Sequence, residues 1–284
     1  MTSECASGEQ WPRCQARPIL IRVSIAVLAF LLVALVPLHA QDPPATTDIP
    51  APIVTDRPTV TNSSVVVPSG SLQVENGFLE TDRQGQSIAD GPETLVRFGV
   101  ATRTELRFTA PNYYYDLNAG GRGSGFGDLG IGVKEQLGPT PGGFDVSVTL
   151  FLSFPTGADT VSSDGYDPGL QVAWSRELSS KWTAAGMLSL YWPTQDHTRD
   201  LTGESTILLD RQLTGPWDAF VEYVGDFPER GGSRQLLHFG TELRTGKRQQ
   251  QQLDFHFGIG LSSAAADHFI GIGYSFRFQA LHRK

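Results

Sequence analysis

The chain has 284 residues, hydrophobic residues at 39% of positions and a formal net charge of −8. An acidic chain lacks the basic surface that nucleic-acid binding needs, so we expect no nucleic-acid partner. Its two cysteines, Cys5 and Cys14, lie near the N-terminus. The rest of the chain therefore offers no disulfide framework and no thiolate metal site.

The first 40 residues have the layout of a secretory signal peptide. Three arginines precede an apolar run from Val23 to Leu38, and Ala40 provides a small residue for cleavage. The run is short for a membrane-spanning helix, and Pro37 closes it. We therefore expect residues 1–40 to be a cleaved signal peptide, not a retained anchor, and the protein to be exported.

Residues 41–69 are rich in proline, threonine and serine and show no helical period. They predict an extended leader that stays in the periplasm or folds into a lumen. Alternating segments begin after Gly70, so we expect a β-barrel over residues 70–278 and a short tail over residues 279–284.

A period of two in hydrophobicity predicts twelve strands, most of them close to the length that a tilted strand needs to cross a bilayer. They are expected near Ser71–Glu80, Thr94–Ala101, Thr104–Pro111, Gly127–Leu137, Phe144–Phe154, Gly169–Leu178, Lys181–Trp192, Ser205–Leu213, Trp217–Asp226, Arg234–Arg244, Leu253–Leu261 and Phe269–Phe278.

The last of these strands is typical of a wall between lipid and water. Ile270, Ile272 and the aromatic residues that follow share one face, whereas glycines, Ser275 and Arg277 share the other. Long connections rich in glycine and aspartate alternate with mostly shorter ones, and an even strand count places both termini in the periplasm. The sequence thus predicts an all-β protein, an antiparallel transmembrane β-barrel of the outer-membrane type with about 12 strands.

If the apolar face meets lipid, the polar face lines the lumen. The predicted lumen-lining residues are Glu75, Arg97, Glu105, Arg107, Lys134, Glu222, His238, Glu242, Asp254, His256 and Arg277. Such mixed charge is compatible with a selectivity surface and equally with salt bridges that fill a small barrel. In the outer loops we expect solute contacts from Tyr113, Tyr114, Tyr115 and Tyr166.

Two motifs invite a chemical interpretation. A G-x-G-x-x-G pattern over residues 125–130 precedes a strand and opens no helix, which argues against a dinucleotide site. The pairs His238/Glu242 and Asp254/His256 could orient a general base or bind a metal, but no serine elbow, cysteine or H-E-x-x-H accompanies them. We expect lumen hydrogen bonding, with no catalytic residues, metal or cofactor.

Four segments together resemble a known family. Thr55-Asp56-Arg57-Pro58 is followed by PSGSLQVENGF, FGDLGIGVKEQL, LFLSFPTG and IGYSFRF, in this order. They are similar to the outer-membrane transporter-like family labelled as the MetA pathway of phenol degradation, over about residues 55–278. The resemblance implies an outer-membrane barrel with a role in uptake of hydrophobic or aromatic compounds, and it carries no catalytic residues.

The end of the chain bears on assembly. Tyr274, Phe276 and Phe278 resemble the aromatic signal that the outer-membrane assembly machinery reads, although six residues follow Phe278. We expect that machinery, the lipid bilayer and a small hydrophobic or aromatic solute to be the partners.

The expected function is passive transport across the outer membrane, by a porin-like channel of a Gram-negative-type envelope. Two alternatives remain open at this point: a membrane-embedded lipid hydrolase, and a non-conducting structural or adhesive barrel. The predicted strand phase turns His238 and His256 inward, away from a lipid substrate, which disfavours the hydrolase. The protein is therefore expected not to be an enzyme.

Overall fold

The computed structural model describes residues 51–118, 123–195 and 197–281. The predicted signal peptide and the first ten residues of the predicted leader lie outside this part of the chain. Among the described residues, no helix has both the length and the apolar character needed to cross a membrane.

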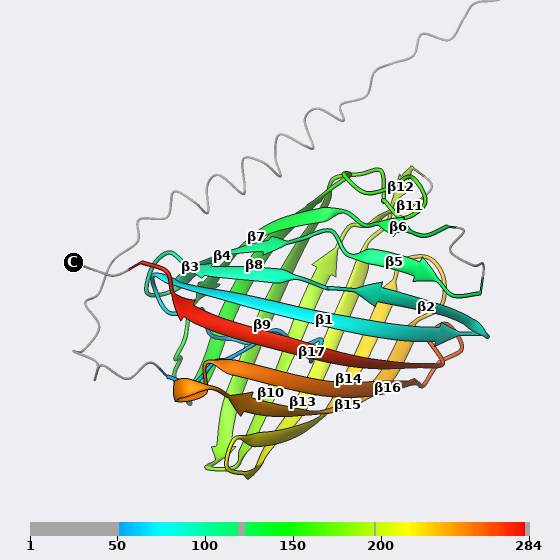
Figure 1. Cartoon of the computed structure of the whole chain (residues 1–284). Helices are drawn as coiled ribbons and strands as arrows, with labels where there is room; N and C mark the ends of the chain where they lie inside the picture. The colour runs from blue at the N-terminus through cyan, green and yellow to red at the C-terminus, as the bar shows by residue number, and fades with distance from the viewer. Residues whose placement is uncertain (1–50, 119–122, 196, 282–284) are drawn as a thin grey trace, which may run out of the picture. The chain divides into compact units, whose positions relative to one another are not determined.

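Twelve antiparallel strands form one closed sheet, in which the last strand pairs with the first (Figure 1). In order around the wall they are β1 (Ser71–Arg83), β3 (Leu95–Gly99), β4 (Thr104–Thr109), β7 (Leu129–Gln136), β8 (Phe144–Phe154), β9 (Asp167–Ser179), β10 (Trp182–Tyr191), β13 (Thr202–Thr214), β14 (Trp217–Pro228), β15 (Arg234–Thr245), β16 (Gln251–Gly260) and β17 (His268–Gln279). Closure rests on twelve residue pairs between β1 and β17, from Ser71 opposite Gln279 to Asp82 opposite His268. The predicted fold and strand count are confirmed.

Three short strands extend one side of the wall. They are β2 (Gln86–Gly91), β5 (Tyr113–Asp116) and β6 (Gly125–Phe126), and they continue the sheet from the second half of β1. β2 and β3 both pair with β1 and are separated by residues 92–94, which include Pro92, so they form one interrupted wall strand. A separate hairpin joins β11 (Thr194–Gln195) to β12 (Thr198–Arg199).

The two ends of the barrel differ in their connections. At one end, the short-turn end, residues 100–103, 137–143, 180–181, 215–216 and 246–250 join the strands. At the other, the long-loop end, the connections include residues 155–166 and the segments that carry the short extra strands. β1 starts and β17 ends at the short-turn end, which is the arrangement that the alternating connection lengths predicted.

Burial is the reverse of that in a soluble sheet. On β17, Ile272 and Phe278 are 55% and 49% exposed, whereas Ser275 and Arg277 on the opposite face are buried. The same contrast appears on β1, where Glu75 is fully buried and Phe78 is 59% exposed. A barrel wall in lipid requires an apolar outer face, because lipid offers charged side chains neither partners nor water. The charged side chains therefore point into the interior, where they find both.

Candidate functional site

The described part of the leader lies inside the barrel. It passes Gln249 at the short-turn end, where the amide of Ile53 donates to the Gln249 carbonyl at 2.8 Å. Thr61 then contacts Glu222 on β14, and Val67 contacts Glu105 on β4, before the chain returns to the short-turn end and starts β1. The leader therefore crosses the lumen and comes back, and its contacts with the wall define the candidate site.

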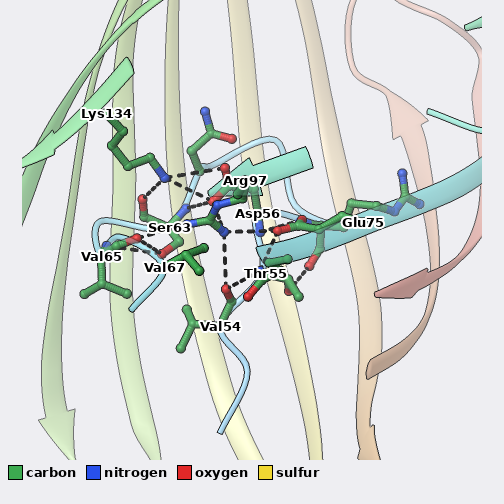
Figure 2. A network of polar contacts seen from close by, with 12 residues as sticks. Val54, Thr55, Asp56, Ser63, Val65, Val67, Glu75, Arg97 and Lys134 are labelled. Carbon is green, nitrogen blue, oxygen red and sulfur yellow. Dashed lines mark hydrogen bonds and ion pairs between the residues drawn. The ribbon is translucent and has the colours of Figure 1, made fainter. Parts of the chain in front are cut away.

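One anchor is Asp56, whose carboxylate joins three cations of the wall. It lies 3.2 Å from Arg97 Nη1, 2.6 Å from Arg107 Nη2 and 3.3 Å from Lys134 Nζ. Glu75 and Glu105 complete this group, which we call the Asp56 cluster; Figure 2 shows Asp56, Glu75 and Lys134 around Arg97. Three cations face three carboxylates, so removing the leader would leave an uncompensated positive charge among nearly fully buried side chains.

The same cluster also fixes the backbone of the leader. Glu75 Oε2 accepts from the amides of Asp56 and Arg57 at 2.9 and 3.0 Å. Arg97 donates to the carbonyls of Val54 and Val65 at 3.2 and 3.1 Å, on the two passes of the leader through the lumen (Figure 2). The fork of a guanidinium thus bridges both passes, which a lysine could not do with the same geometry.

The second anchor is the guanidinium of Arg57, which lies flat on a floor of glycines. A Cβ built on Gly77 would overlap its Cζ atom, and one built on Gly273 would lie 2.6 Å from Nε. Nη1 is paired with Glu93, and Nη2 is 3.4 Å from Asp254 Oδ1. These wall groups, together with His256, form what we call the Arg57 pocket.

A chain of hydrogen bonds joins the Arg57 pocket to the turn of the leader. Glu222 accepts from Val60 N, Thr61 N and Thr61 Oγ1 at 2.9, 2.7 and 2.6 Å, and His238 Nδ1 lies 2.8 Å from its Oε2. His238 Nε2 is 2.9 Å from His256 Nδ1, and His256 Nε2 is 3.3 Å from Arg57 Nη2. With Glu222 ionised, the only arrangement that satisfies every contact has a proton on Nδ1 of each neutral histidine.

At the short-turn end, an unusual turn holds the start of the described leader. Gln250 donates to the Ala51 carbonyl at 2.8 Å, and Arg277 donates to the carbonyls of Ala51 and, at 3.3 Å, Pro52. The 3-10 turn η1 (Lys247–Gln249) contains two residues in the left-handed region, Arg248 at φ 59° and Gln249 at φ 53°. The contacts with the leader give this connection, residues 246–250, a structural role.

The predicted lumen-lining residues divide into two groups. Those that contact the leader are Glu75, Arg97, Glu105, Arg107, Lys134, Glu222, Asp254, His256 and Arg277. His238 joins two of them, Glu222 and His256. Glu242 lies on β15 directly between Asp218 and Asp254 on the neighbouring strands, and its side chain forms no hydrogen bond or ion pair with a described residue. Most of the predicted lumen-lining charges therefore lie in contact with the leader.

The predicted tyrosine contacts occupy different positions from those expected. Tyr113, Tyr114 and Tyr115 form the strand β5 and so belong to the extended wall, not to a free outer loop. Tyr113 packs edge-on against Phe126 of β6, with ring centroids 4.9 Å apart. Tyr166 is 54% exposed and packs against Phe154, where β8 enters its loop.

The proposed assembly residues and the tail also have defined places. Tyr274, Phe276 and Phe278 lie on one face of β17, with the last two rings stacked at 6.3 Å. β17 runs on to Gln279, one residue beyond the predicted end of the barrel, and the Ala280 amide donates to the Gly70 carbonyl at 2.8 Å.

The histidine pairs do not form the couples that their spacing suggested. His238 bonds to Glu222 and His256, not to Glu242, and His256 faces Arg57. Within the described part of the chain, no group of three or more His, Cys, Asp or Glu residues is arranged to hold a metal ion. The arrangement is that of a hydrogen-bonded anchor.

Sequence reasoning did not assign Asp56, Arg57, Glu93 or the floor glycines to the site. Asp56 and Arg57 stood out only as part of the Thr55–Pro58 motif, which was the one available signal. An Asp-Arg pair in a leader without regular structure has no period from which its partners could be predicted.

These features define a class of protein: a closed twelve-stranded antiparallel barrel of the outer-membrane type, with a polar lumen crossed by its own leader. Residues 55–278 match the model of the family described as "Putative MetA-pathway of phenol degradation". The chain belongs to this family. No curated protein sequence matches it.

Solved structures share the fold at low sequence identity. An outer-membrane channel from Pseudomonas putida F1 has a TM-score of 0.56 and 12% identity, covering 76% of this chain and 98% of its own. The NanC porin has a TM-score of 0.53 and 10% identity, with 72% and 98% coverage. At these identities the similarity establishes the barrel architecture and nothing finer.

Proposed function

We propose that the protein is an outer-membrane channel for passive passage of small hydrophobic or aromatic molecules, and that the leader is the plug that controls it. The observation that carries this proposal is the leader itself. It crosses the lumen on two passes and is anchored through Asp56, Arg57 and Thr61 to wall strands on different sides of the barrel. A segment held by such groups at the centre of a pore sets how much of the lumen is open.

Family membership and fold support the channel over the alternatives. Solved structures with this fold are described as an outer-membrane channel and a porin. His238 and His256 face the lumen, where His238 bonds to Glu222 and His256 contacts Arg57 of the leader, which disfavours a lipid hydrolase with its site on the outer face. We place the barrel in the outer membrane, exported by the predicted signal peptide and inserted through the signal on β17.

An aromatic solute would find suitable walls beyond the plug. Phe151 and Tyr191 face the lumen from β8 and β10, with ring centroids 6.1 Å apart, and the Phe151 ring lies over Gly169. Ser189 donates to Glu204 at 3.1 Å close by. An aromatic pair beside hydrogen-bonding groups suits a flat apolar solute that carries one polar substituent.

Single-channel conductance of refolded residues 41–284 in a planar bilayer tests the proposal. We expect small discrete steps that an aromatic solute blocks, and a weaker block after Phe151→Ala. A Phe144→Ala variant, altered on the lipid face of the same strand, is the matched control. A correctly inserted barrel that is silent even after Asp56→Ala would reject the channel and favour the non-conducting alternative.

A further inference from the structure

The Arg57 pocket is built by the wall, and the leader only fills it. Its floor comes from Gly77 on β1 and Gly273 on β17, which are paired directly across the two strands. Asp254 and His256 on β16 form one side, and Glu93, just before β3, forms the other. A planar group can lie against this floor only because two neighbouring strands lack a Cβ at the same level.

Among the described residues, every polar group that contacts the Arg57 guanidinium is a hydrogen-bond acceptor. Glu93 and Asp254 are carboxylates, and the Ile272 carbonyl is 3.4 Å from Nη2. The proton order along the histidine chain makes His256 Nε2 an acceptor as well. A flat site whose described rim groups all accept hydrogen bonds matches guanidinium and amidinium groups, whereas a tetrahedral ammonium cannot use the floor and the rim together.

The pocket lies at one end of a row of acidic side chains. Asp218, Glu242 and Asp254 lie directly opposite one another on β14, β15 and β16, so three carboxylates follow each other across the sheet. Arg244 pairs with Asp218 at 2.5 Å, and Arg57 contacts Asp254 at the other end. Asp254 is fully buried at its side chain, and its Oδ2 atom has no hydrogen-bond partner among the described residues.

We propose that the Arg57 pocket is a binding site for guanidinium and amidinium groups of molecules in the lumen, and that Arg57 occupies it as an internal ligand. The inference rests on the proposed function, in which the leader is the plug of the channel, and it adds that the leader can undock. When Arg57 leaves, Asp254 loses the cation that contacts it, and an external planar cation takes its place. Such a molecule competes with Arg57, so its binding favours the undocked leader.

Isothermal titration of the refolded chain with benzamidine tests this site, with benzamide as the neutral analogue of the same shape. We expect Arg57→Ala to bind benzamidine at least about tenfold more tightly than the unaltered chain does, the size of effect expected for one hydrogen bond to a charged group. Benzamide should show no such gain. Arg57→Lys, which keeps the charge, should bind benzamidine less tightly than Arg57→Ala.

The glycine floor provides the decisive control. Adding Gly77→Ala to Arg57→Ala places a methyl group where the amidinium would lie, and the gain should disappear. Adding Gly130→Ala instead should preserve it, because a Cβ at this lumen-facing glycine meets its nearest neighbour at an ordinary 3.5 Å. Equal binding of benzamidine and benzamide, or a gain that survives Gly77→Ala, would overturn the proposal.

This result is separable from that of the proposed function. Binding is read by calorimetry in folded protein, so a silent channel leaves the test intact. Block of conductance by a neutral aromatic solute does not involve the Arg57 pocket. The heat-modifiable mobility of folded barrels on gels identifies any variant that fails to fold before titration.

Discussion

Asp56→Ala should release the leader from the lumen, because it removes the one carboxylate that the leader contributes to the Asp56 cluster. Arg97, Arg107 and Lys134 would then share only Glu75 and Glu105, and Arg97 and Lys134 are fully buried. Removing one partner from a buried ionic group costs about 3–5 kcal/mol. At about 1.4 kcal/mol per tenfold, the equilibrium constant for docking of the leader should fall by a factor of about 10² to 10³·⁵.

Thiol labelling measures this equilibrium directly. Residues 41–284 contain no cysteine, so Ser64→Cys introduces a single reactive site in the leader. Ser64 is 4% exposed and bonds to Ser175 Oγ at 2.7 Å, which protects it while the leader is docked. The labelling rate of Ser64→Cys is proportional to the fraction of molecules with an undocked leader, so it should rise when Asp56→Ala is added. It can rise only to the rate at which the reagent labels a fully exposed thiol.

The matched control is Asp159→Ala, which removes the same charge from an exposed position in the 155–166 loop. It should leave the labelling rate unchanged. An acceleration of less than about threefold for Asp56→Ala, well below the shift worked out from the cluster, would refute the view that this carboxylate anchors the leader.

Three further changes probe other contacts. Gly77→Ala should displace Arg57 and speed the same labelling, whereas Gly130→Ala should not, and equal rates would argue against the glycine floor. Glu222→Gln places an amide opposite four donors, so we expect about ten- to a hundredfold faster labelling, and no change would mean that this bond pattern is dispensable. Asp128 accepts from Thr156, Gly157, Ser162 and Ser163, so Asp128→Ala should expose the 155–166 loop to protease while the barrel stays folded. Burial raises the pKa of the Asp128 carboxyl, but these hydrogen bonds outweigh it and hold the pKa below its ordinary value. The loop should therefore stay protected at neutral pH and become cleavable only as pH falls through that lowered pKa; cleavage that begins at neutral pH would contradict this.

The predicted strands correspond one to one with the strands of the closed wall. The segment expected over Phe144–Phe154 has the observed bounds, because its alternation is unbroken. The short strands β2, β5 and β6 were missed because Pro92, Pro111 and Gly127 interrupt the pattern at the places where the wall is interrupted. The tyrosines of β5 were consequently assigned to a loop.

The fold could be predicted from the sequence and the contacts of the interior charges could not, and both results have the same physical origin. Period-two alternation determines which face of a strand is apolar, and a barrel in lipid needs little more than that from each strand, so the sequence by itself determined the fold, the strand count and the polar interior. It could not determine what those interior charges contact. Arg57 meets Asp254, 197 positions away, only after β17 has closed on β1 and the leader has folded inward. A pairing of that kind depends on the three-dimensional position of each buried charge, which only the tertiary structure decided.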